Sequence, residues 1–188
     1  MPSRSDKRKK VLHEALASFP LFVDYSIKPS LHNIKVLKKT NPAKMKNPVL
    51  SFVVQRAMNH VVERFVIEVV QAWEILNSEL KRIGKRSLGV SNKDFKHLKK
   101  IRNKLVAHKM ENHIKTDRYA KWYKKNYGSY EAVLGLILRI AERIKEKIYY
   151  LEDLDLIEYS SVSHKGVVEF SEKDVQDLLN ALKQNGIY

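Results

Sequence analysis

Apolar residues recur at intervals of three and four along most of this 188-residue chain, the spacing that places them on one face of an α-helix. The longest such pattern starts at Pro48 and meets no helix breaker before Gly84. Asn47 is suited to cap this helix, and Pro48 to occupy its first turn. We therefore expect a long helix over residues 48–83 to form the spine of the core. Its expected apolar positions are Leu50, Val53, Val54, Ala57, Val61, Phe65, Val69, Ala72, Leu76 and Leu80.

Two more long helices follow from the same spacing. Residues 95–110 are expected to form one, opened by Ser91 with Asp94 as a capping box. Its apolar stripe is Phe95, Leu98, Ile101 and Leu105. Residues 129–151 are expected to form the other, with a seam that contacts more than one neighbour. That seam consists of Leu134, Ile137, Ala141, Ile144, Ile148 and Leu151, broadened by Val133, Leu136 and Ile140.

The remaining segments are predicted to be shorter. Short helices are expected over residues 11–19, 117–127 and 172–184, the last capped by Ser171 with Asp174 and ended by Gly186. Four prolines and no clear period predict an irregular segment over residues 20–48, with room for a short extended piece at 21–25. A small hairpin of residues 157–162 with 167–170 is compatible with their β-branched and aromatic content.

The expected fold class is therefore all-α, an up-and-down helical bundle of four to five main helices with a possible small C-terminal β-hairpin. The expected units are a basic N-terminal extension with a short helix (residues 1–47), the helical bundle (48–154) and an acidic C-terminal extension with a final helix (155–188).

Composition excludes several classes of protein. Hydrophobic residues make up 44% and charged residues 30% of the chain, as in ordinary globular proteins. The absence of cysteine excludes disulfides and thiolate zinc sites and fits a cytoplasmic protein. No apolar run has membrane-spanning length, and no Walker loop or dinucleotide fingerprint is present. We expect no membrane association, no metal and no cofactor.

Positive charge is concentrated in two regions of a chain with a net charge of +15. Residues 85–125 carry 14 Lys and Arg against 3 Asp and Glu, and residues 1–46 carry 11 against 3. Residues 151–188 are acidic, with 3 basic against 8 acidic side chains. A basic surface of this kind attracts polyanions, so we expect nucleic acid as a partner. The alternative is an ordinary solvated basic surface.

Arg102 and His108 are the candidate chemical groups of the helix over residues 95–110. They border its apolar stripe, about 120° and ~9 Å apart on an ideal helix. An arginine fork matches two phosphate oxygens, and a histidine titrates near neutral pH. The alternative for His108 is a structural one, because the dipole at a helix C-terminus stabilises a protonated histidine. His60 lacks a partner in the sequence, and we interpret it as a structural or surface histidine.

The segment Arg102-Asn103, followed by four residues that end in Ala107 and then by His108, resembles the arginine–polar–spacer–histidine motif of the HEPN superfamily. The resemblance implies an all-α bundle over residues 49–154 and catalytic roles for Arg102, Asn103 and His108. Many HEPN domains are metal-independent endoribonucleases of toxin and phage-defence systems, whereas others only bind nucleotides or partners. It also implies a homodimer whose composite site contains two copies of the motif. Met110 occupies the position of a tyrosine that is modified in one branch of the family.

Lysines around this motif are candidates for binding RNA phosphates: Lys99, Lys104, Lys109, Lys121, Lys124 and Lys125. Aromatic residues alternate with cations between residues 118 and 127, a composition that can stack bases. The alternative is that Tyr119, Trp122 and Tyr123 pack one face of a helix, since their spacing is helical.

The favoured function is a metal-independent endoribonuclease of toxin or phage-defence type that acts as a homodimer on RNA. It would leave a 2′,3′-cyclic phosphate and a 5′-hydroxyl. One alternative is a non-catalytic module that binds nucleic acid or nucleotides. The other is a protein-interaction subunit, whose basic face meets an antitoxin or another defence-system partner.

Overall fold

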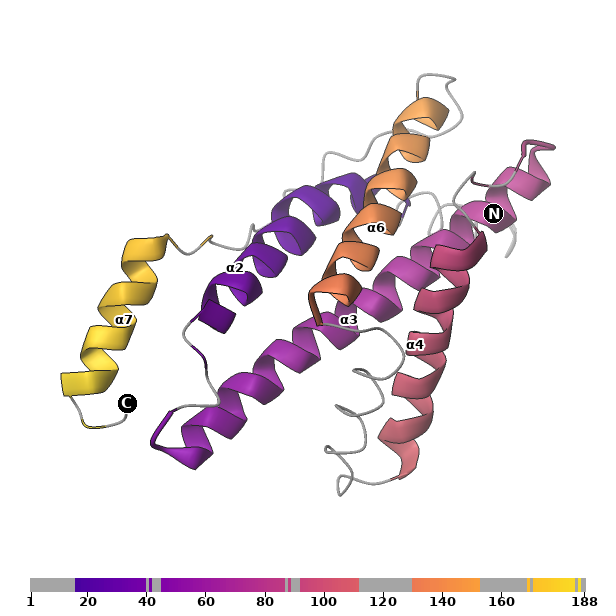
Figure 1. Ribbon diagram of the computed structural model, residues 1–188. Coiled ribbons are helices and arrows are strands. Elements are labelled where there is room, and N and C mark those ends of the chain that lie inside the picture. Colours follow the sequence, from indigo (N-terminus) through magenta and orange to yellow (C-terminus); the bar gives the residue numbers. More distant parts are fainter. Residues whose placement is uncertain are drawn as a thin grey trace, which may run out of the picture.

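A 35-residue helix, α3 (Pro48–Arg82), is the spine of the bundle, and α4 and α6 pack against it. The computed structural model describes residues 16–39, 41, 45–86, 88, 92–111, 130–152, 169, 171–184 and 186. These residues form helices and no strand, so the all-α class is confirmed for them. In chain order the elements are η1 (Val23–Ile27), α2 (Lys28–Lys39), α3, α4 (Asn92–Glu111), α6 (Tyr130–Glu152) and α7 (Glu172–Gln184). The helices α2, α3, α4 and α6 run in alternating directions (Figure 1).

The ends of α3 are fixed by the residues that the sequence suggested. The Asn47 side chain accepts hydrogen bonds from the backbone N–H groups of Val49 and Leu50, at 3.0 and 3.1 Å. After the last turn, Gly84 has a φ of 68°, which a residue with a side chain rarely adopts. The N–H of Lys85 then donates to the carbonyl of Leu80 at 2.9 Å, which closes the helix.

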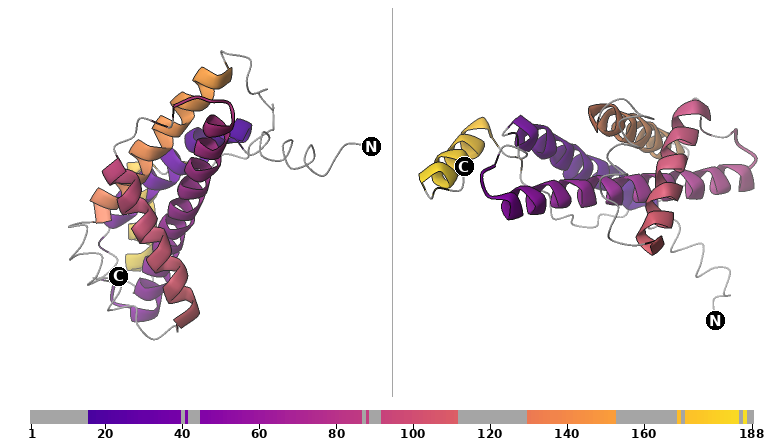
Figure 2. Two further views of the ribbon diagram at one scale, coloured as in Figure 1. Left: turned by 90° about the vertical axis from the view of Figure 1, so that its right-hand side faces the viewer. Right: turned by 60° about the horizontal axis from the view of Figure 1, so that its bottom comes forward.

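The first turns of α3 do not have the buried face that the apolar spacing predicted. Of the predicted positions, Val53 is 53% exposed, Ala57 is exposed, and Leu50 and Val54 are only half-buried. The neighbouring Val49 and Phe52 are 69% and 51% exposed. The reason is geometric, because this end of α3 extends beyond α4 and α6 (Figures 1 and 2). Full burial begins at Met58 and continues to the end of the helix, at Val62, Phe65, Val66, Val69, Val70, Ala72, Trp73, Leu76 and Leu80.

The prediction of an irregular segment over residues 20–48 is wrong for residues 20–39, and so is the short extended piece expected at 21–25. Residues 16–22 are helical and lead through the π-helix η1 into α2. Pro29 lies in the first turn of α2, and the wider turn of η1 precedes it. A proline ring clashes with the carbonyl four residues earlier in a regular α-helix, which here belongs to Tyr25 within η1. Val23, Ile27, Leu31 and Ile34 are all buried in the core.

An ion network joins this N-terminal region to α6. Lys145 on α6 donates to Asp24 in η1 at 2.6 Å. Lys28 lies 2.8 Å from Asp24 and 2.7 Å from Glu142. Burial raises the pKa of the Asp24 carboxyl, but hydrogen bonds from Lys145 and Lys28 outweigh it, so the pKa lies below its ordinary value. The network therefore stabilises the packing of η1 on α6 only while Asp24 is ionised.

The expected seam of α6 is confirmed, because all nine of its named apolar side chains are buried. The helix contacts η1, α2, α3 and α4, in agreement with the expectation of several neighbours. α7 has the predicted bounds and the predicted cap, in which Ser171 Oγ accepts from the Asp174 N–H at 3.1 Å. α7 contacts α2 and lies on the far side of it from α4 (Figure 1).

Several predictions lie wholly or largely outside the described residues. They are the helix over residues 117–127, the first part of the helix over 11–19, the Ser91 end of the capping box of α4 and the hairpin, of which only Glu169 is described. Within the described part of the chain, no helix combines the length and apolar character that crossing a membrane requires.

Candidate active site and nucleic-acid interface

Helix α4 carries the candidate site, and apolar contacts fix it against α3. Leu98 and Ile101 are fully buried, as the predicted stripe requires. The Phe95 ring stacks on Trp73 of α3, with ring centroids 4.6 Å apart and planes 19° from parallel. In the connection between α3 and α4, the Leu88 N–H donates a hydrogen bond to the Asn77 side chain at 3.2 Å. These contacts set which face of α4 points outward.

Arg102 lies at the edge of α4 that faces α3, where Glu74 binds it. Its Nη1 donates to Glu74 Oε2 at 2.8 Å, and Lys99 Nζ lies 2.7 Å from Glu74 Oε1. The Arg102 side chain is only 20% exposed, whereas the carboxylate side chain is 37% exposed. The carboxylate thus holds two cations, one turn apart, at the margin of the core.

Asn103 fixes the remaining side of the same guanidinium. Its Oδ1 accepts from Arg102 Nε at 3.2 Å and from Nη2 at 3.1 Å. An arginine has five N–H donors, and these contacts together with Glu74 use three of them. Within the described part of the chain, one N–H on each terminal nitrogen has no further partner, and such donors can bind phosphate oxygens. Asn103 therefore orients Arg102. The polar side chain of Asn103 has this role whether or not the segment is a catalytic motif.

The protonation state of Glu74 is coupled to these cations. Burial raises the pKa of its carboxyl, but hydrogen bonds from Lys99 and Arg102 outweigh the burial and lower the pKa from its ordinary value. Glu74 is therefore ionised at neutral pH and offsets part of the positive charge of Arg102. An incoming phosphate shares the guanidinium with this carboxylate.

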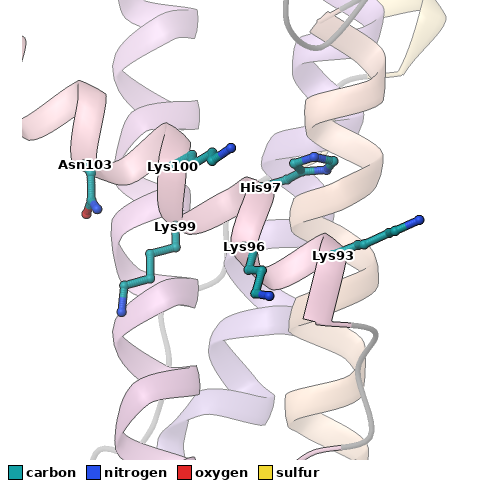
Figure 3. Close-up of a pocket in the computed structure, with 6 residues that line it drawn as sticks. All are labelled: Lys93, Lys96, His97, Lys99, Lys100 and Asn103. Atoms are coloured by element: carbon teal, nitrogen blue, oxygen red, sulfur yellow. The ribbon is translucent and has the colours of Figure 1, made fainter.

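The outward face of α4 forms a shallow, open hollow of about 360 Å³ beside Arg102. Figure 3 shows that its side chains project from successive turns, with Lys96 and Lys99 on one side of the helix and His97 and Lys100 on the other. The lining residues are Lys93, Lys96, His97, Lys99, Lys100 and Asn103. A hollow lined by four lysines and a histidine attracts an anion and repels a cation.

The structure brings together only some of the predicted site residues. Arg102, Asn103 and Lys99 form one hydrogen-bonded group through Glu74. His108, Lys104 and Lys109 lie on α4, but their side chains lie outside the described part of the structure. The positions of Lys121, Lys124 and Lys125 lie outside the described residues altogether. Lys99 is occupied by Glu74, so it differs from a lysine that is open to solvent.

Sequence reasoning missed two parts of this site. The first is Glu74, which no motif indicated, because its contact with Arg102 depends on how α3 and α4 pack. The second is the outer group of Lys93, Lys96, His97 and Lys100. The spacing of its lysines, three and then four residues, was visible in the sequence as the polar counterpart of the apolar stripe.

Among the described residues, no group of three or more acidic or histidine side chains is placed to hold a metal ion. Comparisons of the chain with protein-family models, with curated proteins and with solved structures give no match.

Proposed function

We propose that this chain is a metal-independent endoribonuclease in which Arg102 holds the scissile phosphate and His108 moves the protons. The observation that carries the proposal is the setting of Arg102. Glu74 and Asn103 fix its guanidinium at the margin of the core, beside a hollow lined by lysines. A fixed arginine with two remaining donors is suited to bind a phosphate whose negative charge grows during cleavage.

The reaction needs a proton acceptor and a proton donor in addition to this phosphate clamp. The 2′-oxygen of the RNA forms a bond to phosphorus, and its proton passes to a neutral His108. The bond from phosphorus to the 5′-oxygen breaks, and that oxygen takes a proton from a protonated histidine. The products are a 2′,3′-cyclic phosphate and a 5′-hydroxyl.

The two histidines come from two copies of the chain in this proposal. Each α4 carries a single histidine at the position six residues after Arg102. A homodimer that joins two α4 helices would contain two Arg102 and two His108 side chains in one site. The resemblance of Arg102, Asn103 and His108 to the HEPN motif supports this arrangement, and a role in a toxin or phage-defence system is part of the same proposal.

The test is cleavage of mixed RNA in excess EDTA by the purified chain and by its His108→Ala variant. We expect cyclic-phosphate ends from the wild type and none from the variant. His32→Ala is the matched control, because it removes an exposed histidine from α2 and should cleave like the wild type. Circular dichroism shows whether each variant keeps its helical fold. Cleavage by His108→Ala at the wild-type rate would rule out the proposed mechanism.

A second function, nucleic-acid binding without cleavage, is favoured by the contact of Arg102 with Glu74. The Glu74 carboxylate offsets the positive charge of Arg102, which a catalytic phosphate clamp needs. The outer lysines, in contrast, can bind phosphates whether or not the RNA is cleaved. Recovery of bound RNA uncut, together with affinity that falls steeply with salt, would support this second function over the first.

A further inference from the structure

The basic side chains in the first half of α4 fall into two groups that differ in their partners. Lys99 and Arg102 face α3 and share the Glu74 carboxylate. Lys93, Lys96 and Lys100 are exposed on the outer face. Within the part of the chain that the structure describes, these three lysines have no acidic partner. A phosphate can bind them without displacing a carboxylate.

The three outer lysines lie on one face of the helix, with Lys96 towards one edge and Lys93 and Lys100 towards the other. On an ideal helix they fall within about 60° of one another, with rises of about 4.5 and 6 Å between them. Because lysine side chains are long and mobile, their ammonium groups can each meet a separate phosphate of one strand. A bound mononucleotide would need only one or two of them.

Asn103 connects these lysines to Arg102. It lines the hollow with the outer lysines (Figure 3), and its Oδ1 also accepts from the Arg102 guanidinium. Lys100 and Arg102 are about 3 Å apart along the helix axis but about 160° apart around it, so they lie on different sides of α4. A strand along the outer lysines therefore approaches Arg102 only by crossing Asn103.

We propose that Lys93, Lys96 and Lys100 form a phosphate track that binds successive phosphates of one nucleic-acid strand along the outer face of α4. The choice of RNA as the natural strand rests on the proposed function. The track itself contacts only phosphates, so it binds single-stranded DNA by the same contacts. This difference allows the track and the nuclease to be tested separately.

The test measures binding of a labelled deoxythymidine oligomer, which has no 2′-hydroxyl, as a function of salt. Each phosphate contact in a single strand contributes about 0.7 to the slope of log affinity against log salt. The triple variant Lys93→Gln, Lys96→Gln, Lys100→Gln should therefore lower the slope by about 2 relative to the full-length wild type. The matched control, Lys35→Gln, Lys46→Gln, Lys183→Gln, has the same net charge but carries its changes at exposed positions away from α4, and it should keep the slope.

An unchanged slope in the α4 variant, an equal loss in the control, or no binding by the wild type would overturn the track. Cleavage of RNA in EDTA, measured on the same proteins, separates the two proposals. A wild type that binds DNA through the track and never cleaves RNA contradicts the nuclease alone. A wild type that cleaves RNA, with an α4 variant of unchanged slope, contradicts the track alone.

Discussion

Glu74 couples the candidate site to the stability of the bundle. Its carboxylate binds both Lys99 and Arg102 across the contact between α3 and α4. The sequence predicted Arg102, Asn103 and the apolar edge beside them, because a helix places such residues at known angles. It did not predict Glu74. This residue is 28 positions from Arg102 in the sequence, and the packing of α3 against α4 brings the two together.

Glu74→Gln should lower the free energy of unfolding at pH 7 by about 1 kcal/mol, a small value because the pair is partly exposed. The native pKa of Glu74 lies below its ordinary value of 4.5. The stabilisation is therefore complete above that pH and is lost as the pH falls through the lowered native pKa. Urea denaturation at a series of pH values should show the wild type and the variant converging below about pH 4.5.

The control for this prediction is Glu68→Gln, which removes a carboxylate that pairs with Arg64 within α3 alone. That change should alter stability by no more than about 0.5 kcal/mol. If the stability difference between wild type and Glu74→Gln stayed constant from neutral to acidic pH, the proposed coupling would be incorrect.

Arg102→Lys should lower RNA cleavage by about a hundredfold or more, because an ammonium keeps the charge but loses the paired donors of the fork. The measurement is the initial rate of cleavage in EDTA, with thermal unfolding as a check on the fold. Arg82→Lys is the control, since it changes another arginine paired with a glutamate, at the end of α3. Equal rates for Arg102→Lys and the wild type would remove Arg102 from the mechanism.

At the scale of elements, apolar spacing predicted α3, α4, α6 and α7, with the observed α7 bounds. It failed where two local signals disagreed. Val23, Ile27, Leu31 and Ile34 have helical spacing, but Pro20 and Pro29 interrupt it, and the segment was interpreted as having no clear period. Proline excludes a regular helix at its position, and η1 with α2 satisfies both signals through a locally wider turn.

The exposed start of α3 shows a second limit of prediction from apolar spacing. The spacing indicates which face of a helix is apolar, but it does not show whether another element covers that face. Phe52 and Phe65 belong to the same helix, yet their exposed fractions are 51% and 3%. Phe65→Ala should lower the free energy of unfolding by about 3–5 kcal/mol, whereas Phe52→Ala should change it by less than about 1 kcal/mol. Urea denaturation of the two variants tests this directly, and comparable losses would mean that the first turns of α3 are covered in solution.

At the scale of the whole molecule, the helices α4 and α7 lie apart. The basic α4 lies on one side of α3, and α7, in the acidic C-terminal region, contacts α2 on the other (Figures 1 and 2). Among the described residues, α7 contacts α2 and does not cover the outer face of α4.

The proposed composite dimer predicts that two inactive variants restore cleavage when they are mixed. Arg102→Ala and His108→Ala should each be inactive as a homodimer. A mixed dimer of the two retains one arginine and one histidine in the shared site, so mixing the variants should restore part of the wild-type cleavage rate. The restored activity should rise as subunits exchange, and it should be absent when each variant is assayed alone. A mixture as inactive as its components would contradict a site shared between two copies.

Because Phe95 stacks on Trp73, tryptophan fluorescence can report on the contact between α3 and α4. The chain has two tryptophans, Trp73 and Trp122, so a Trp122→Phe variant would emit from the stacked indole alone. Trp73 is only 5% exposed, and an indole in such a site emits at shorter wavelength than one in water. If RNA binds without moving α4, the emission wavelength of Trp73 should not change. If binding moves α4 away from α3, the emission should shift to longer wavelength. The emission spectrum therefore distinguishes a rigid site from one that opens around its substrate.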